Sequence, residues 1–207
     1  MKKLFAIAGF LIFTSSVFAQ YYEVTPLAGY TFSGKADNGY ATYDFSNSFL
    51  YGGRLDVQFS DLSYLELSVR RIEPTVSYKI ASAANLAEFN TGTAHYMAGY
   101  LREFSEGKIK PYGVISAGTS RYWTKGDADD YRKWFFSTEF GLGAKMFFND
   151  NIGVRLQASV TTPWDFAGGG MYWGVGTGGG GGSASLTFGI PVAHWDLSAG
   201  LIFRIRD

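Results

Sequence analysis

The chain contains no cysteine among its 207 residues, which excludes disulfide bonds and thiolate metal sites. It also has no excess of basic charge, because 18 Lys and Arg stand against 18 Asp and Glu. A basic surface for nucleic acid is therefore not indicated. We expect no nucleic-acid partner, no cofactor and no metal ion. Packing, hydrogen bonds and ion pairs have to hold the fold.

Long hydrophobic runs are missing as well once the first twenty residues are set aside. A membrane-spanning helix needs about twenty consecutive apolar residues, so a helical membrane protein is excluded. The chain is nevertheless 46% hydrophobic and 18% aromatic, with a mean hydropathy of −0.02. A transmembrane β-barrel has this composition, because alternate residues of each strand face lipid and lumen. If the chain spans a membrane, it does so as a closed barrel.

The first residues have the three parts of a secretory signal peptide. Lys2 and Lys3 give it a charged start, residues 4–13 form an apolar run too short to cross a bilayer, and Ala19 ends a small-residue cleavage site. An uncleaved membrane helix is the alternative, and the short run and the cleavage site both argue against it. We predict a signal peptide over residues 1–19 and one mature domain over residues 20–207, with a net charge of about −2.

Strict alternation of apolar and polar residues predicts β-strands along the mature domain. The clearest case is residues 152–164, and residues 134–148 and 194–206 repeat the pattern. In the last of these segments, Ile202 is the one apolar exception on the polar face. Eight strands is the minimum for a transmembrane barrel. We predict an all-β fold, an eight-stranded antiparallel up-and-down transmembrane β-barrel. The other predicted strands cover residues 22–32, 51–59, 65–70, 94–104 and 110–123, the last two with a blurred pattern.

Short and long connections alternate along the chain. Outer-membrane barrels have short periplasmic turns and longer outer loops. This order places both chain ends in the periplasm, four loops outside the cell, and the protein in the cell outer membrane. Short turns are predicted at residues 60–63, 105–108 and 149–151, and long links at residues 33–47, 73–91, 124–132 and 165–192.

Two sets of side chains follow from this topology. Tryptophans at the outer ends of strands form the expected aromatic girdle of the membrane interface, namely Trp123, Trp134, Trp164 and Trp195. A narrow lumen would bring inward-facing charges of opposite sign into contact, so we predict a filled lumen rather than an open pore. The alternative is that some of these charges line water near the periplasmic end. The charges are Glu23, Arg54, Asp56, Glu66, Arg70, Glu139, Lys145, Arg155, Asp196 and Arg204.

The last predicted strand carries a short pattern of polar, glycine and hydrophobic residues in Ser198, Gly200, Phe203 and Ile205. It resembles the β-signal through which the outer-membrane assembly machinery recognises its clients. Such signals usually finish on a terminal aromatic residue, whereas here Ile205 is followed by two more residues. We expect the assembly machinery to be a partner.

Three stretches carry a wider resemblance: EVTPLAGYTF at residues 23–32, EGKIKPYGVISAG at residues 106–118 and WDLSAGLIFRI at residues 195–205. They resemble the small outer-membrane β-barrel family, the OmpA/OmpX-like transmembrane barrels. Members of that class serve as structural proteins, as adhesins or in unknown roles, so the resemblance implies a fold and a location but transfers neither a reaction nor a ligand. We expect a monomer in contact with outer-membrane lipid.

The favoured function is a non-enzymatic wall or surface-interaction protein with a partner at its four outer loops. A narrow channel for small solutes and a lipid-modifying enzyme are the alternatives. An enzyme would need Ser beside His and an orienting acid. His95 and His194 are the only histidines, both near outer strand ends, and Asp196 is the expected partner of His194, but the sequence places no Ser. The glycine-rich residues 167–182 have no phosphate-loop context and are predicted to form a flexible outer loop.

Overall fold

The computed structural model describes residues 21–33, 35–37, 41–80, 86–125, 132–164 and 193–206. The predicted signal peptide and the glycine-rich residues 167–182 lie outside these ranges. Every regular element in the described part of the chain is a β-strand. The same residues contain no helix with the length and hydrophobicity to cross a membrane.

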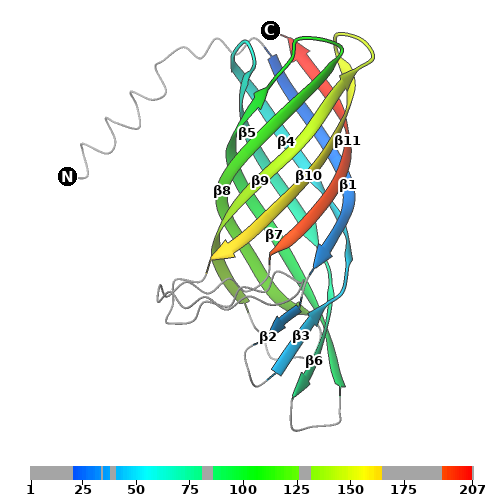
Figure 1. Ribbon diagram of the computed structural model, residues 1–207, viewed down its shortest axis with the longest axis vertical. Coiled ribbons are helices and arrows are strands. Elements are labelled where there is room, and N and C mark those ends of the chain that lie inside the picture. Colours follow the sequence, from blue (N-terminus) through cyan, green and yellow to red (C-terminus); the bar gives the residue numbers. More distant parts are fainter. Residues whose placement is uncertain are drawn as a thin grey trace, which may run out of the picture.

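Eight strands form a closed antiparallel barrel, as the alternation predicts (Figure 1). Two pairings complete the ring, because β1 pairs with β11 and β7 pairs with β8. Each strand is tilted and pairs with antiparallel neighbours on both sides, so the barrel wall has no free edge. The barrel strands are β1 (Tyr21–Ser33), β4 (Ser48–Ser60), β5 (Ser63–Ile72), β7 (Leu86–Glu103), β8 (Ile109–Lys125), β9 (Arg132–Phe147), β10 (Ile152–Trp164) and β11 (His194–Arg206).

The two ends of the barrel differ. At one end, here called the turn end, β1 begins and β11 ends, and short turns join β4 to β5, β7 to β8 and β9 to β10. The last of these turns is closed by the Asn149 side chain, whose oxygen accepts hydrogen bonds from the backbone amides of Asn151 and Ile152 at 3.0 and 2.7 Å. The short turns lie where the connection lengths predict them.

At the opposite end, here called the loop end, three short strands extend the wall beyond the barrel: β2 (Lys35–Asp37), β3 (Ala41–Phe45) and β6 (Thr75–Ile80). β3 pairs with β6, and β6 pairs with the first part of β7. The long links predicted at residues 33–47 and 73–91 therefore contain short strands that the alternation did not predict. These strands continue ladders that the barrel begins, so their backbone groups are paired without a long alternating pattern in the sequence.

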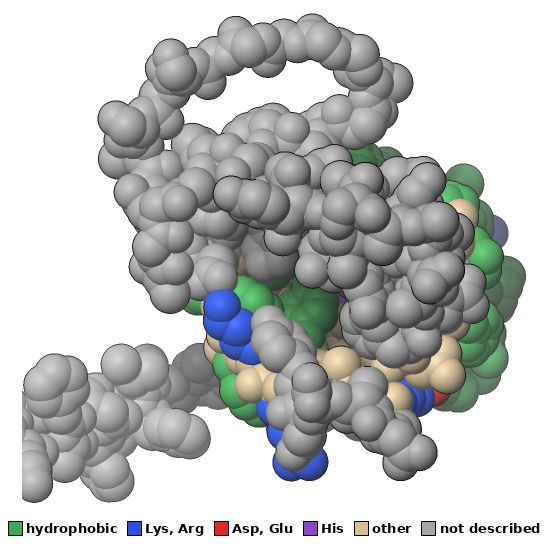
Figure 2. Space-filling view, turned by 90° about the horizontal axis from the view of Figure 1, so that it is seen from below, with side chains coloured by type: hydrophobic (Ala, Val, Ile, Leu, Met, Phe, Trp, Pro, Cys, Tyr) green, Lys and Arg blue, Asp and Glu red, His purple; other side chains and the backbone are tan. Residues whose placement is uncertain are grey.

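The alternation in sequence becomes an apolar outside and a mostly polar inside. Along β10, even-numbered side chains such as Leu156 face outward, and odd-numbered side chains such as Arg155 are buried in the lumen. Seen from the loop end, hydrophobic side chains line the outside of the wall where it is visible, and Lys and Arg side chains show at separate points (Figure 2). An apolar exterior of this kind suits a lipid environment.

The lumen also contains two small apolar clusters. Tyr64, Leu101, Tyr112 and Val114 form one cluster, and Leu27, Leu50 and Ile72 form the other. Apolar side chains on the inward face explain why the pattern of β7 and β8 is blurred, since an inward Leu101 or Val114 looks like an outward residue when only the sequence is read. Ile202, the exception on β11, is completely buried in the same way.

Candidate functional site

All ten charges predicted to face the lumen lie on the inward face of the barrel. Nine of them are buried, and the tenth, Arg204, keeps 12% of its side chain exposed near the turn end. The structure brings them together as a continuous set of ion pairs that runs along the barrel in three levels. Some of these pairs join neighbouring strands, such as Glu23–Arg204, and others, such as Arg155–Glu66, cross the lumen.

At the level nearest the turn end, Lys145 of β9 is the central group. Its Nζ lies 2.6 Å from Glu23 of β1, 2.9 Å from Asp56 of β4 and 3.3 Å from Glu103 of β7. Glu23 is also paired with Arg204, at 2.6 Å. Glu103 is a lumen charge that the sequence did not identify, because it follows the apolar inward positions of β7.

At the middle level, Arg155 of β10 crosses the barrel. It contacts Glu66 of β5 and Asp56, the latter at 3.0 Å, and its Nε donates to the Tyr112 hydroxyl at 2.7 Å. Arg54 supplies a second cation to Glu66 at 2.6 Å. Both oxygens of Glu66 thus meet guanidinium groups, which are strong charge-assisted partners.

Nearer the loop end, Arg70 of β5 holds two carboxylates. Its guanidinium lies 2.5 Å from Glu139 of β9 and 2.6 Å from Asp196 of β11. The Thr31 hydroxyl donates a further hydrogen bond to Asp196 at 2.6 Å. Asp196 was expected to pair with His194. It pairs with Arg70 and Thr31 instead.

Beyond Arg70 lies a cluster of neutral polar groups around the two histidines. Both histidines are buried inside the lumen, at 1% and 0% exposure, rather than at the rim. His95 Nδ1 lies 2.6 Å from the Ser120 hydroxyl, and the His194 ring nitrogens lie 3.3 Å from Ser33 and 3.0 Å from Tyr122. The two rings stand 5.6 Å apart.

Ser120 beside His95 is the kind of pair that the sequence alone could not place. A catalytic triad also needs an acid on the second ring nitrogen of the histidine. His95 Nε2 has no hydrogen-bond partner, and the Ser120 hydroxyl is engaged with that of Ser137 at 2.6 Å. Among the described residues, moreover, no group of three or more His, Cys, Asp or Glu side chains is arranged to hold a metal ion.

The four tryptophans all face outward and lie toward the loop end of their strands. Trp134 and Trp195 are more than half exposed, and Trp164 donates its indole N–H to the Thr138 hydroxyl at 3.0 Å. Trp123 and Trp134 share the guanidinium of Arg121, which lies 5.5 and 5.7 Å from the two ring centres. Tryptophan with a polar contact at one end suits the boundary between lipid and water.

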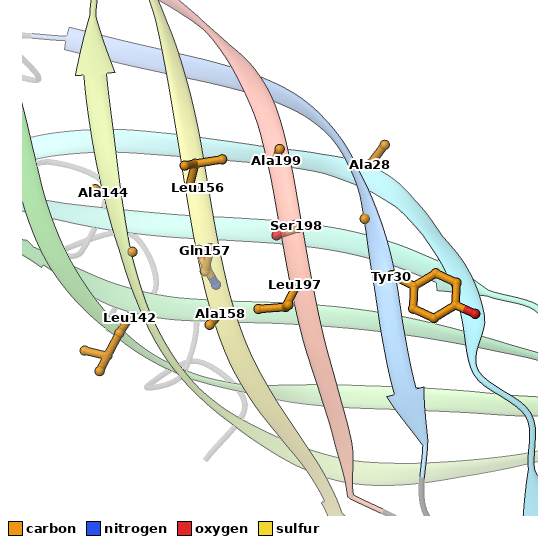
Figure 3. A pocket seen from close by; sticks show the side chains of 12 residues that line it. Ala28, Tyr30, Leu142, Ala144, Leu156, Gln157, Ala158, Leu197, Ser198 and Ala199 are labelled. Atoms are coloured by element: carbon orange, nitrogen blue, oxygen red, sulfur yellow. The ribbon is translucent and has the colours of Figure 1, made fainter.

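A shallow groove on the outer wall crosses β1, β11, β10 and β9 (Figure 3). Its floor contains Ala28, Ala144, Ala158 and Ala199, and longer side chains such as Leu142 and Tyr30 stand at its sides. Gln157 points through the wall into the lumen, where it accepts a hydrogen bond from Tyr112 at 2.8 Å. The groove itself is apolar and offers no group for catalysis.

These features agree with comparisons to known proteins. The model of the outer membrane protein beta-barrel domain family matches residues 5–166. The chain belongs to this family. It is accordingly a β-barrel of the cell outer membrane. No curated protein matches the sequence.

Solved structures with similar folds include OprG from Pseudomonas aeruginosa, with a TM-score of 0.63, 9% identity and 91% of this chain and 97% of that chain covered. Neisserial surface protein A has a TM-score of 0.54, 14% identity and coverages of 91% and 97%. The outer membrane protease OmpT from Escherichia coli is also similar, with a TM-score of 0.46, 8% identity and coverages of 89% and 96%. At these identities the likeness concerns the fold alone.

Proposed function

We propose that this family member is a non-enzymatic integral outer-membrane protein with a closed lumen, which acts as a wall component or through a surface partner at its outer loops. The observation that carries the proposal is the set of buried ion pairs around Lys145, Arg155 and Arg70. These side chains reach across the barrel at three successive levels. A solute passing through would have to break ion pairs that are shielded from water.

The energetics of burial support a closed barrel. A buried charge without a partner costs several kcal/mol, and removing one member of a buried pair leaves such a charge behind. In this lumen, each of Glu23, Glu66 and Asp196 has at least one cation within 2.6 Å. Opening a pore would separate these pairs at several levels together, so the closed arrangement is favoured.

Planar bilayer recording tests the closed lumen directly. The purified full-length barrel should give no conductance steps above the background of empty detergent. Arg155→Gln changes a lumen residue, and Leu156→Ala changes its outward neighbour as a matched control. Steady conductance in the unsubstituted protein that changes with Arg155→Gln and not with Leu156→Ala would overturn the proposal and favour the narrow channel.

The two forms of the proposed role can be separated in cells. A strain lacking the protein is complemented with the full chain or with a chain from which residues 167–182 are deleted. If the barrel is a wall component, both chains restore the barrier to a hydrophobic dye. If a surface partner is required, the shortened chain reaches the outer membrane without restoring attachment to that partner. If the strain that lacks the whole protein shows neither a weaker barrier nor a loss of attachment, both forms of the role are contradicted.

The chain ends and the last strand complete the proposal. We place the turn end in the periplasm and the loop end outside the cell, because short turns mark the periplasmic side in this class of protein. The residues Phe203 and Ile205 face outward on β11, with 45% and 58% of their surface exposed. That position leaves them accessible to the assembly machinery, for which we propose Ser198, Gly200, Phe203 and Ile205 as the recognised segment. We propose a monomer.

A further inference from the structure

Three arginines lie on the outward face of the barrel wall toward the loop end. They are Arg71 of β5, Arg121 of β8 and Arg132 of β9. An outward-facing arginine is costly within the apolar part of a bilayer, and its cost falls toward the interface, where polar partners are present. We therefore expect these arginines to contact a polar or anionic group at the interface.

The three arginines line one pocket of about 520 Å³. The pocket crosses β4, β5, β7 and β8 and extends to the start of β9, on the opposite face of the wall from the lumen network. Its outward-facing lining combines cations with aromatic and aliphatic side chains, namely Tyr51, Val69, Arg71, Ala94, Tyr96, Arg121, Trp123 and Arg132. The pocket thus has a hydrophobic floor and a cationic margin.

Trp123 packs directly against the barrel wall in this pocket. Its indole lies over Gly92 so closely that a Cβ on Gly92 would stand 2.3 Å from the ring, which only glycine permits. The guanidinium of Arg71 lies 5.0 Å from the Trp123 ring centre and that of Arg121 lies 5.5 Å from it. Cation–π contacts of this kind hold both guanidinium groups over one ring and leave their edges for a ligand.

The charges of Arg71 and Arg121 are only partly balanced within the described residues. Glu73 accepts from Arg71 at 2.8 Å and from Lys125 at 2.6 Å, and the hydrogen bond from Lys125 lowers the pKa of Glu73 below its ordinary value. Arg121 has no carboxylate partner in the part of the chain that the structure describes, and the Nε atoms of Arg71 and Arg121 are buried without a hydrogen-bond acceptor. The positive charge of Arg121 therefore remains for an anion to balance.

We propose that this pocket binds the phosphate group of an anionic lipid of the outer leaflet. Guanidinium groups match phosphate oxygens through paired hydrogen bonds. Trp123 and Trp134 mark the headgroup level, and the pocket faces the bilayer, so the phosphate is delivered by a lipid and the apolar lining contacts the start of its acyl chains. The site is independent of the lumen, and it stands whether or not the lumen conducts.

Native mass spectrometry of the full-length barrel released from neutral detergent tests the site. The probes are lipid A, a phosphorylated glycolipid, phosphatidylethanolamine as a zwitterionic lipid, and inorganic phosphate alone. We expect lipid A to bind the unsubstituted protein in preference to phosphatidylethanolamine. The double variant Arg71→Gln with Arg121→Gln should bind lipid A at least about tenfold more weakly, because two charge-assisted contacts are lost.

Arg102→Gln is the matched control, since Arg102 is also exposed on β7 but lies at the turn end. An equal loss of lipid A in this control, or no loss in the double variant, would refute the pocket as the site. Binding of inorganic phosphate as strong as that of lipid A would refute a lipid as the source. Heat-modified migration on a gel verifies that each variant is folded.

A second variant tests the same site in the opposite direction. Glu73→Gln removes the carboxylate that competes for Arg71, so lipid A should bind more tightly than to the unsubstituted protein. This result cannot arise from misfolding, because misfolding would lower binding. Unchanged or weaker binding by Glu73→Gln would count against the proposal.

Discussion

The guanidinium of Arg155 on β10 contacts the carboxylate of Glu66 on β5, although the two residues are 89 positions apart in the chain. In the strand order of the barrel, four strand-to-strand steps separate β10 from β5, so the two residues project from opposite walls. The contact therefore spans the full width of the lumen. It makes the stability of the barrel dependent on side chains in its interior.

Arg155→Leu should destabilise the folded barrel by about 3–5 kcal/mol, because it leaves Asp56 and Glu66 buried with one cation fewer. Urea-induced unfolding in detergent micelles, followed by tryptophan fluorescence, measures the change. Leu156→Ala, on the outward face of the same strand, removes only part of a lipid contact and should cost far less. Equal losses in the two variants would mean that the lumen pairs add nothing to stability.

Gly200→Ala should weaken the seam between β1 and β11. A Cβ at Gly200 would lie 2.6 Å from the Pro26 carbonyl oxygen and 2.7 Å from the Thr25 side chain, so the backbone of β1 has to shift. We expect a loss on the order of 1–3 kcal/mol in the same unfolding measurement. Gly53→Ala is the control, since its Cβ would meet the nearest atom at 3.9 Å. If Gly200→Ala and Gly53→Ala lower the free energy of unfolding by the same amount, this account of the seam is wrong.

Phe203→Ala should reduce assembly in cells without reducing folding in detergent. Its side chain is outward and half-exposed, so little packing is lost, whereas the proposed assembly segment loses its one aromatic group. The measurement is the heat-modifiable fraction in isolated outer membranes, compared with the fraction after refolding of the purified chain. Phe140→Ala, an outward phenylalanine on β9, serves as the control. If both phenylalanines have the same effect in cells, the segment is not recognised through Phe203.

Expression of the protein should leave the masses of lipid A and of the phospholipids unchanged. The buried Ser120–His95 pair has no acid on His95 Nε2, and the His194 ring is bound by Ser33 and Tyr122. Mass spectrometry of extracted lipids from cells with and without the protein tests this expectation. A new lipid species that disappears with Ser120→Ala or His95→Ala would establish an enzyme and overturn the proposed function.

The sequence was sufficient for the strands whose two faces differ in polarity. On β10 every inward position is polar, glycine or proline, so Arg155 and Gln157 could be assigned to the lumen from alternation alone. On β7 the inward face carries Met97 and Leu101, which hid the strand's parity and with it Glu103. Alternation in the sequence predicts which face a residue takes only where the two faces of the strand differ in polarity.

The partners of the lumen charges could not be predicted in the same way. Ion pairs such as Arg70–Asp196 join residues 126 positions apart, and their identity depends on strand tilt and stagger around the closed ring. The Ser120–His95 contact and the cluster at Trp123 depend on the same geometry. The extensions β2, β3 and β6 were missed because backbone pairing, and not alternation, defines them.

Lys145 meets partners from three other strands, Glu23 of β1, Asp56 of β4 and Glu103 of β7. In an open sheet those strands are apart, and the ammonium group would face the membrane interior alone. A half-inserted ribbon would therefore be unstable in lipid even with its outer face already apolar. Entry into the bilayer and closure of the ring therefore have to be one cooperative event. The interior charges are fully paired only when all eight strands are in place.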